Sequence, residues 1–364
     1  MEYTLRSLGS FSEMKYGKMP NKKMSSDKGK YPIFSGYRVV GYCDECNIGE
    51  QQLVVVARGV GGTGDVKLSP GACFLTNLSI AVLVDESVAL KKYLYYYFLK
   101  NNLRYLDSGS AQSQITIGDL KNVEVPLPSI ETQKKVVSIL DVIDEKINNN
   151  VAINDNLADL LQTIYQDRFG NDILAVNQGV LSDICSYSRD KVAVSELNVS
   201  TYFSTENMLS EKAGSTEATS LPTTSQTIAC HKGDTLISNI RPYFKKIVYC
   251  EDKCGCSTDV LCFTPSQPRY SAYLFSTLYA DKFFAFMVAG SKGTKMPRGD
   301  KQQIMTYPVV LPSEEELAGF NTIASPLLEQ IYSNRAENKR LSILRDTLLP
   351  KLMSGEIDVS AVQL

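Results

Sequence analysis

The chain has 364 residues, of which 43% are hydrophobic and 21% charged. This is the composition of a globular protein with two or three domains. No apolar run approaches the ~20 residues that a membrane-spanning helix needs, and the first residues lack the apolar core of a secretory signal. Nine cysteines are an odd and dilute set, which favours a reducing compartment over a disulfide framework. We therefore expect a cytoplasmic protein that does not engage a membrane.

Net charge and histidine content exclude further classes. The formal net charge is −2, which speaks mildly against a surface that is basic all over. His231 is the single histidine, so a metal site with two histidines is excluded.

The chain contains two copies of one sequence plan. Leu127-Pro128-Ser129 recurs as Leu311-Pro312-Ser313, an offset of 184. Six further pairs share that offset: Glu131 and Glu315, Ile139 and Ile323, Ile147 and Ile331, Asn154 and Asn338, Leu157 and Leu341, Thr163 and Thr347. Residues 108–119 also align with 289–300, at an offset of 181, and 5–8 resemble 181–184. Ordered matches along both halves indicate a duplication, with one copy over about 1–170 and the other over 171–364.

Each copy ends in a predicted long helix. Residues 132–168 contain neither Gly nor Pro, and Pro128 and Ser129 supply start signals. Apolar residues recur at alternating steps of four and three, a heptad seam that begins at Val136 in the first helix and at Phe320 in the second. In the second helix Pro326 predicts a kink or a later start. At ~1.5 Å per residue, each helix would be roughly 55 Å long.

Two asparagines interrupt each seam at the same positions. They are Asn150 and Asn154 in the first helix and Asn334 and Asn338 in the second. An amide buried without a partner costs a few kcal/mol, so only alignments that pair it are stable. The pattern predicts that the two helices pair as a coiled coil, with these asparagines fixing the register. Two ordinary amphipathic helices with tolerated polar residues are the alternative.

The front of each copy predicts a mixed globule. Residues 52–57, 81–84 and 246–249 are expected strands between glycine-rich turns, and 89–100 and 270–286 are expected aromatic-rich helices. The predicted fold class is therefore α+β. It has two mixed globules, at 1–128 and 171–312, and two long antiparallel helices, at 129–170 and 313–364, related as a pseudo-twofold internal repeat.

Charge differs between these segments. The two globules carry +3 and +1, whereas each helical segment carries −3. This distribution of charge is expected if the globules bind a polyanion and the helices bind a different kind of partner.

The chain offers little catalytic chemistry. Residues 59–64 satisfy G-x-G-x-x-G, but a predicted strand follows them instead of the helix that a dinucleotide site needs. Cys43 and Cys46 form a lone C-x-x-C pair, and the spacing of the cysteines at 250–262 is irregular, so free thiols are expected rather than zinc. We find no P-loop, nuclease carboxylate cluster or methyltransferase motif. We therefore expect no catalytic residue, no metal and no cofactor.

Three basic loops with aromatic residues are the candidate binding segments of the chain. They lie at 15–30, 239–246 and 291–298. Cationic side chains neutralise phosphates, and Arg, Gln and Asn can read base edges in the major groove. A solvated surface is the alternative for any one run. The predicted DNA-binding residues are Lys15, Lys18, Lys22, Lys23, Arg58, Arg241, Tyr243, Lys245, Lys246, Lys292, Lys295 and Arg298.

Four segments carry a family resemblance. They are 31–36 (Tyr-Pro-Ile-Phe-Ser-Gly), 233–243 (Gly-Asp-Thr-Leu-Ile-Ser-Asn-Ile-Arg-Pro-Tyr), 125–133 around Val-Pro-Leu-Pro, and 348–357 (Leu-Leu-Pro-Lys-Leu-Met-Ser-Gly-Glu-Ile). Over essentially its whole length, the chain resembles the DNA-specificity subunit of type I restriction–modification systems. It departs from that family at 314–316, where three glutamates stand in place of the usual Glu-Gln pair.

The resemblance implies a division of labour. Residues 1–128 and 171–312 would be target-recognition domains, each reading half of a bipartite double-stranded DNA sequence. The helices at 129–170 and 313–364 would set the length of the unread spacer. Two methyltransferase subunits would dock on this chain and a restriction translocase would join them, with S-adenosylmethionine, ATP and catalysis belonging to these partners. The alternatives are a nuclease or methyltransferase with an unrecognised site, and a coiled-coil scaffold whose globules bind protein.

Overall fold

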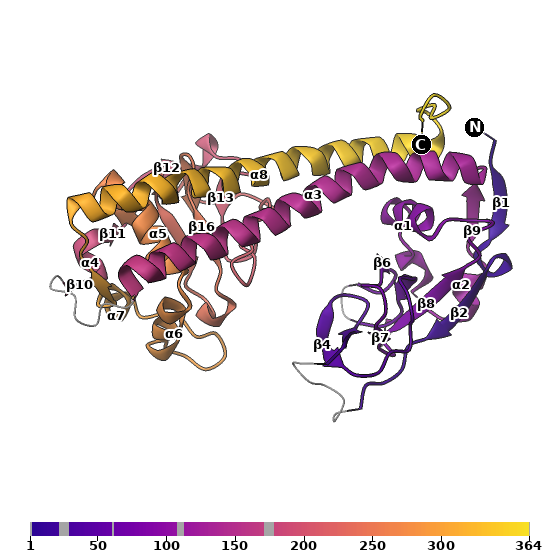
Figure 1. The fold of residues 1–364 in the computed structure, drawn as a ribbon, viewed down its shortest axis with the longest axis horizontal. Coiled ribbons are helices and arrows are strands. Elements are labelled where there is room, and N and C mark those ends of the chain that lie inside the picture. Colours follow the sequence, from indigo (N-terminus) through magenta and orange to yellow (C-terminus); the bar gives the residue numbers. More distant parts are fainter. Residues whose placement is uncertain (1, 22–28, 60–61, 108–112, 171–177, 364) are drawn as a thin grey trace. The chain divides into compact units, whose positions relative to one another are not determined.

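The computed structural model describes residues 2–21, 29–59, 62–107, 113–170 and 178–363. The chain forms two compact units (Figure 1). Unit 1 comprises Met1–Asn148 and Asn338–Leu364, and unit 2 comprises Asn149–Glu337. Each unit therefore combines a globule with parts of two long helices, α3 (Ile130–Tyr165) and α8 (Glu314–Ser354). The mixture of sheet and helix confirms the predicted α+β class.

Unit 1 is built on a four-stranded antiparallel sheet with the order β2-β8-β5-β6. A smaller sheet has the order β4-β3-β7, and β1 pairs with β9. The strands are β1 (Thr4–Ser7), β2 (Ser12–Tyr16), β3 (Tyr31–Phe34), β4 (Val39–Cys43), β5 (Leu53–Val56), β6 (Val66–Leu68), β7 (Phe74–Leu75), β8 (Ser79–Val84) and β9 (Glu124–Leu127). The short helices are α1 (Lys91–Lys100) and α2 (Ile117–Lys121).

Strand β5 shows why this sequence forms a buried central strand. Its four apolar residues are fully buried, and consecutive side chains of a strand point to opposite faces. Leu53 and Val55 pack in the cluster that contains α1, whereas Val54 packs with Phe34 and Leu75 of the smaller sheet. An uninterrupted apolar run is what a strand covered on both faces requires.

Unit 2 has the corresponding four-stranded sheet, with the order β11-β18-β15-β16. A second sheet has the order β12-β14-β17-β13, and β10 pairs with β19. The strands are β10 (Gln178–Val180), β11 (Cys185–Tyr187), β12 (Lys191–Ala193), β13 (Tyr202–Phe203), β14 (Gln226–Cys230), β15 (Thr235–Ser238), β16 (Ile247–Tyr249), β17 (Cys254–Cys256), β18 (Val260–Pro265) and β19 (Pro308–Val310). The helices are α4 (Leu181–Ile184), α5 (Ser271–Tyr279), α6 (Asp281–Ala289) and α7 (Lys301–Met305).

The long helices are antiparallel within each unit. In unit 1 the Asp144 carboxylate of α3 pairs with Arg345 of α8 at 3.0 Å, and Ile147 accepts a hydrogen bond from Asn338. Along α3 the residue numbers thus rise while those of their partners on α8 fall. In unit 2 the buried Leu161 of α3 belongs to the same core cluster as residues near the start of α8. Among the described residues, no helix combines the length and the hydropathy needed to cross a membrane.

The structure corrects three expectations: a later start of the second long helix, one continuous helix over 270–286, and one offset of the repeat. Helix α8 begins at Glu314 and continues through Pro326, because Phe320, Ala324 and Leu328 are buried on either side of the proline and hold the helix to the core. The aromatic-rich segment 270–286 forms two helices that are separated at Ala280.

The third error concerns the repeat alignment at 108–119. Helices α2 and α7 begin at Ile117 and Lys301, an offset of 184 and not 181. Their N-caps, Thr116 and Asp300, accept backbone hydrogen bonds and so fix these starts. The matching Gly-Asp dipeptides that suggested the other offset lie inside α2 in unit 1 but before α7 in unit 2.

Candidate nucleic-acid interface

Two of the predicted basic loops lie side by side in unit 2. Residues 239–246 follow β15 and residues 291–299 precede α7. The backbone N–H of Arg241 donates to the Pro297 carbonyl at 2.8 Å, and that of Gly299 donates to the Asn239 carbonyl at 3.3 Å. Ile240 and Arg298 form an antiparallel bridge between these contacts. We call these two segments the paired loops.

The paired loops contain a strained backbone. Arg241 and Lys245 flank a 3-10 turn and have φ values of 50° and 51°. A neighbouring turn holds Glu211 and Lys212 at φ values of 53° and 62°. These four are the non-glycine residues with positive φ within the described part of the chain, and each costs roughly 1–2 kcal/mol.

Backbone hydrogen bonds join the two strained turns. The N–H of Glu211 donates to the Phe244 carbonyl at 2.8 Å, and that of Lys212 donates to the Lys245 carbonyl at 3.0 Å. The strain is thus maintained by surrounding structure, a situation that concentrates at functional sites.

Asp281, the first residue of α6, binds two lysines near the paired loops. Its Oδ1 lies 2.8 Å from the Lys212 ammonium and 3.1 Å from that of Lys245. The hydrogen bond from Lys212 and the proximity of Lys245 hold the pKa of the Asp281 carboxyl below its usual value. The charge of Lys245 is therefore partly neutralised inside the protein.

Other cations of the paired loops also have internal partners. Lys246 donates to the Thr205 carbonyl at 2.6 Å, Lys292 pairs with Asp300, and Arg298 pairs with Asp259 at 3.1 Å. Burial lowers the pKa of the Lys246 ammonium. These contacts fix the loops in place and reduce the charge that each cation offers to a ligand.

Arg241 differs from these cations. Its side chain is half-buried, and its Nε is a buried atom without a hydrogen-bond partner among the described residues. The neighbouring Tyr243 is 47% exposed and its ring lies against Phe244, with centroids 4.8 Å apart. Lys295 is exposed at the far end of the second loop. Arg241 thus has an unpartnered Nε, and Tyr243 and Lys295 are exposed side chains of the same region.

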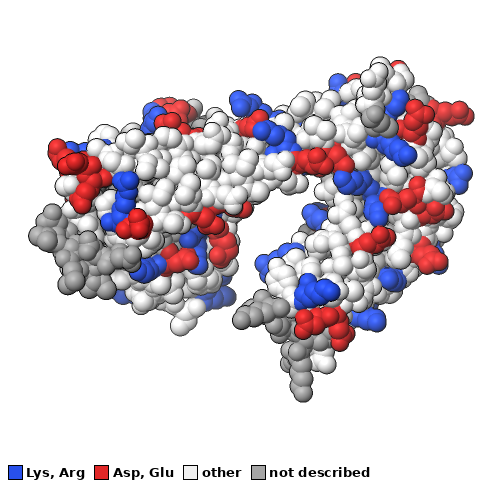
Figure 2. Space-filling view, in the orientation of Figure 1, with Lys and Arg blue, Asp and Glu red and all other residues white. Residues whose placement is uncertain are grey.

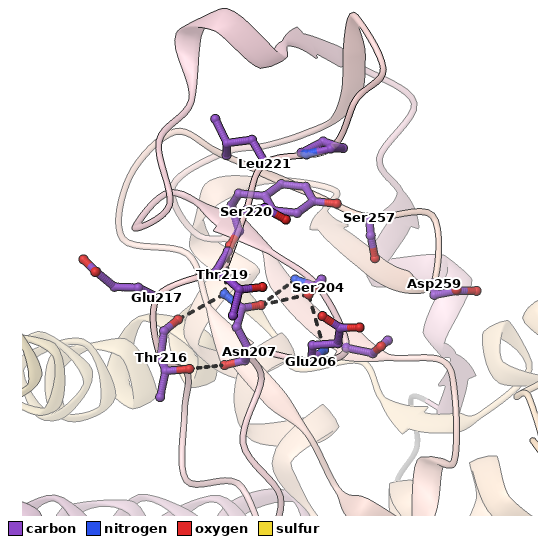
Figure 3. A pocket seen from close by; sticks show the side chains of 14 residues that line it. Ser204, Glu206, Asn207, Thr216, Glu217, Thr219, Ser220, Leu221, Ser257 and Asp259 are labelled. Atoms are coloured by element: carbon purple, nitrogen blue, oxygen red, sulfur yellow. Dashed lines mark hydrogen bonds between the residues drawn. The ribbon is translucent and has the colours of Figure 1, made fainter. Parts of the chain in front are cut away.

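A polar pocket of about 330 Å³ adjoins the paired loops (Figure 3). The segment from Thr216 to Leu221 forms one side, and Ser257 and Asp259 lie on the opposite side. Thr205 and Asp259 line the pocket and also bind Lys246 and Arg298, so the pocket and the paired loops share side-chain contacts.

Internal hydrogen bonds hold the pocket wall. The Asn207 amide donates to the Thr216 carbonyl at 3.0 Å and to the Tyr202 carbonyl at 2.9 Å. Hydroxyl, amide and carboxylate groups can bind the donors and acceptors of base edges. Sequence reasoning missed this pocket, although the run of Ser and Thr at 215–225 was a signal that could have drawn attention to it.

Unit 1 carries the equivalent loop arrangement. Arg58 lies two residues beyond β5 and bridges Gln114, as Ile240 lies two residues beyond β15 and bridges Arg298. The N–H of Ile115 donates to the Ala57 carbonyl at 3.0 Å, which matches the bond between Gly299 and Asn239 in unit 2. The loops that follow the two corresponding strands are thus held in the same way.

The remaining predicted residues of unit 1 are less well defined. Lys15 is exposed and its ammonium donates to the Asn47 carbonyl at 3.3 Å. Lys18 is exposed and forms an isolated parallel bridge with Thr76. Arg58 is also exposed. Lys22 and Lys23 lie outside the described residues. On the visible face of each unit, basic and acidic side chains are interspersed (Figure 2).

The helix asparagines make three different contacts. Asn334 donates to the Oδ1 of Asn154 at 2.9 Å, and both side chains are buried. Asn150 donates to Glu337 at 2.7 Å, and Asn338 donates to the Ile147 carbonyl at 3.3 Å. Each of the four predicted asparagines therefore bonds to the opposite helix.

The cysteine-rich region is a packed thiol cluster. All nine cysteines are free thiols, and eight of them are buried. Cys250 and Cys254 lie 3.5 Å apart between their sulfur atoms, and hydrogen bonding to Cys230 together with burial raises the pKa of Cys250. Among the residues that the structure describes, no group of three or more potential ligands is arranged to hold a metal ion.

The comparisons with known proteins find similarity to one class of protein. Residues 1–158 match a family model described as the type I restriction modification DNA specificity domain. This part of the chain is therefore similar to the DNA-specificity subunits of type I restriction–modification systems. The resemblance found in the sequence is confirmed.

Individual relatives extend this similarity. A Mycoplasma pneumoniae protein assigned as a type I specificity subunit is 30% identical over 166 residues, which span 43% of this chain and 44% of that protein. The MjaIX type I restriction enzyme specificity subunit of Methanocaldococcus jannaschii is 22% identical over 78% of this chain and 73% of its own length. The crystal structure of a type I system S subunit from M. genitalium has a TM-score of 0.62 at 20% identity, covering 97% of this chain and 96% of that one. That last likeness shows the fold.

Proposed function

We propose that this chain reads a bipartite double-stranded DNA target, with one half-site contacted by each unit. The observation that carries this proposal is the repeated loop arrangement, in which the loop after β5 or β15 is bridged to the segment before α2 or α7. The same scaffold thus presents a loop with an exposed or unpartnered arginine in each unit. The residues proposed to contact DNA are the twelve predicted from the sequence.

The two long helices would set the distance between the half-sites. Their antiparallel contacts within each unit, and the buried hydrogen bond between Asn154 and Asn334, support a coiled coil with a fixed register and a pseudo-twofold duplicated plan. A fixed register gives a fixed separation, on the order of one DNA turn of about 34 Å. The asparagines would act as helix-pairing residues without touching DNA.

Partners would supply the chemistry. Two methyltransferase subunits and the restriction translocase would bind this chain, and the chain itself would need no cofactor. Mapping of methylated bases in genomic DNA, from cells that express the chain with its modification subunits, tests the proposal. We expect one motif with two specified halves around an unspecified spacer, whereas a contiguous motif or no new methylation would contradict it.

Insertion of four residues into both helices, near Asn150 and Asn334, tests the spacing role. The insertion lengthens each helix by about 6 Å, which is close to the rise of two base pairs. We expect a longer spacer between unchanged half-sites. An unchanged spacer would show that the helices do not set the distance.

A further inference from the structure

Arg241 occupies a backbone position that the other unit gives to glycine. The residue after the bridge is Gly59 in unit 1, with φ of 141°, and Arg241 in unit 2, with φ of 50°. Glycine adopts positive φ without steric cost, whereas arginine pays roughly 1–2 kcal/mol there. In unit 1 the space of a side chain is already filled, because a Cβ on Gly59 would clash with the Tyr37 hydroxyl.

The arginine side chain is held but not neutralised. Lys245, Lys246, Lys292 and Arg298 all have acceptors within unit 2, whereas Arg241 has a buried Nε without a partner. A buried donor that lacks a hydrogen bond costs about as much as a lost hydrogen bond. Unit 2 therefore tolerates two unfavourable features at Arg241 that a glycine would remove, which a functional role of the arginine side chain would explain.

From this geometry we infer that Arg241 is a specificity-determining residue of unit 2 that donates to the edge of a guanine. This inference rests on the proposed DNA-reading function. A guanidinium is a planar fork that matches the paired acceptors O6 and N7 of guanine. A half-buried side chain on a backbone fixed by the Pro297 hydrogen bond suits such directional contact. The exposed Lys295 at the loop end suits a phosphate, which needs only a nearby point charge.

The substitution Arg241→Gly provides a sharp test because it copies unit 1. It removes the side chain and relieves the backbone, so we expect a thermal midpoint equal to or above that of the wild type. Arg241→Lys keeps the positive charge but loses the fork. Lys295→Ala is the matched control, an exposed cation of the same paired loops.

The measurement is selection of duplexes from a random DNA library by the chain assembled with its modification subunits. Wild type should enrich a bipartite motif. Both Arg241 variants should lose preference at one G·C pair of one half-site, by about 5- to 150-fold, while the other half-site is unchanged. Lys295→Ala should keep the whole motif and weaken binding to all sequences, with a salt slope reduced by about one.

Different failures have different meanings. If the Arg241→Gly protein keeps the full motif, or weakens all sequences equally with a lower salt slope, Arg241 does not read a base and the inference is wrong. If wild type itself enriches no bipartite motif, the proposed function fails, and the inference fails with it. An Arg241→Gly protein with a markedly lower thermal midpoint would also overturn the inference, because the strain argument requires the opposite.

Discussion

The buried hydrogen bond between Asn154 and Asn334 predicts an asymmetric response to mutation. Asn334→Leu leaves the Oδ1 of Asn154 buried without its donor, since that bond measures 2.9 Å and Asn154 is 8% exposed. A buried polar group left unsatisfied costs about 1–3 kcal/mol. Replacement of both asparagines by leucine removes the unsatisfied group, so the double variant should be close to wild type and far more stable than the sum of the single effects.

Urea unfolding followed by helical circular dichroism measures this coupling. With an m-value of about 2 kcal/mol/M, the single variants should lower the urea midpoint by roughly 0.5–1.5 M. Asn149→Leu is the matched control, because Asn149 is an exposed residue of α3 and should change stability by less than about 0.5 kcal/mol. Additive losses in the double variant would refute the reasoning, since they would mean that the two amides contribute independently.

Two further predictions concern charged contacts inside each unit. The pKa of Asp281 is lowered by its ion pairs, so these pairs stabilise unit 2 at pH values above the unfolded pKa. This stabilisation is lost as the pH falls through the folded pKa. Lys245→Ala should therefore reduce the loss of thermal stability below about pH 4. In unit 1 the buried Tyr96 hydroxyl donates to Asp144 at 2.8 Å, so Tyr96→Phe should cost about 1.5–3 kcal/mol in urea unfolding. Tyr105→Phe, at a position 71% exposed, should cost nothing measurable; equal losses in these two variants would contradict the second prediction.

The elements that sequence reasoning predicted well are those with a strong local pattern. Strand β5 is a run of four apolar residues that is buried on both faces, and α3 carries a long heptad seam without Gly or Pro. Local rules failed where packing overrides them. Pro326 lies inside α8 because the residues around it are buried against the core, and no local signal shows this.

The candidate site was predicted only in part, because charge along the sequence does not reveal charge pairing in space. The basic runs at 239–246 and 291–298 do come together, yet most of their cations are bound by acceptors from distant segments. Asp281 and Asp259 belong to a helix start and a turn that carry no binding signal of their own. Arg241 is distinguished from Lys245 and Lys246 by a missing partner, which only the three-dimensional arrangement can show.

The two units together suggest how one scaffold can carry different reading residues. Both loops are held at their ends by the same backbone contacts, Ile115 to Ala57 in unit 1 and Gly299 to Asn239 in unit 2. Backbone hydrogen bonds do not depend on side-chain identity, so the residue that follows the bridge can change without loss of the fold. Gly59 adopts positive φ at this position without strain, whereas Arg241 adopts it with backbone strain, as residues at functional sites do. The residue at this point of each unit can therefore vary while the sheet and the helix caps remain as they are.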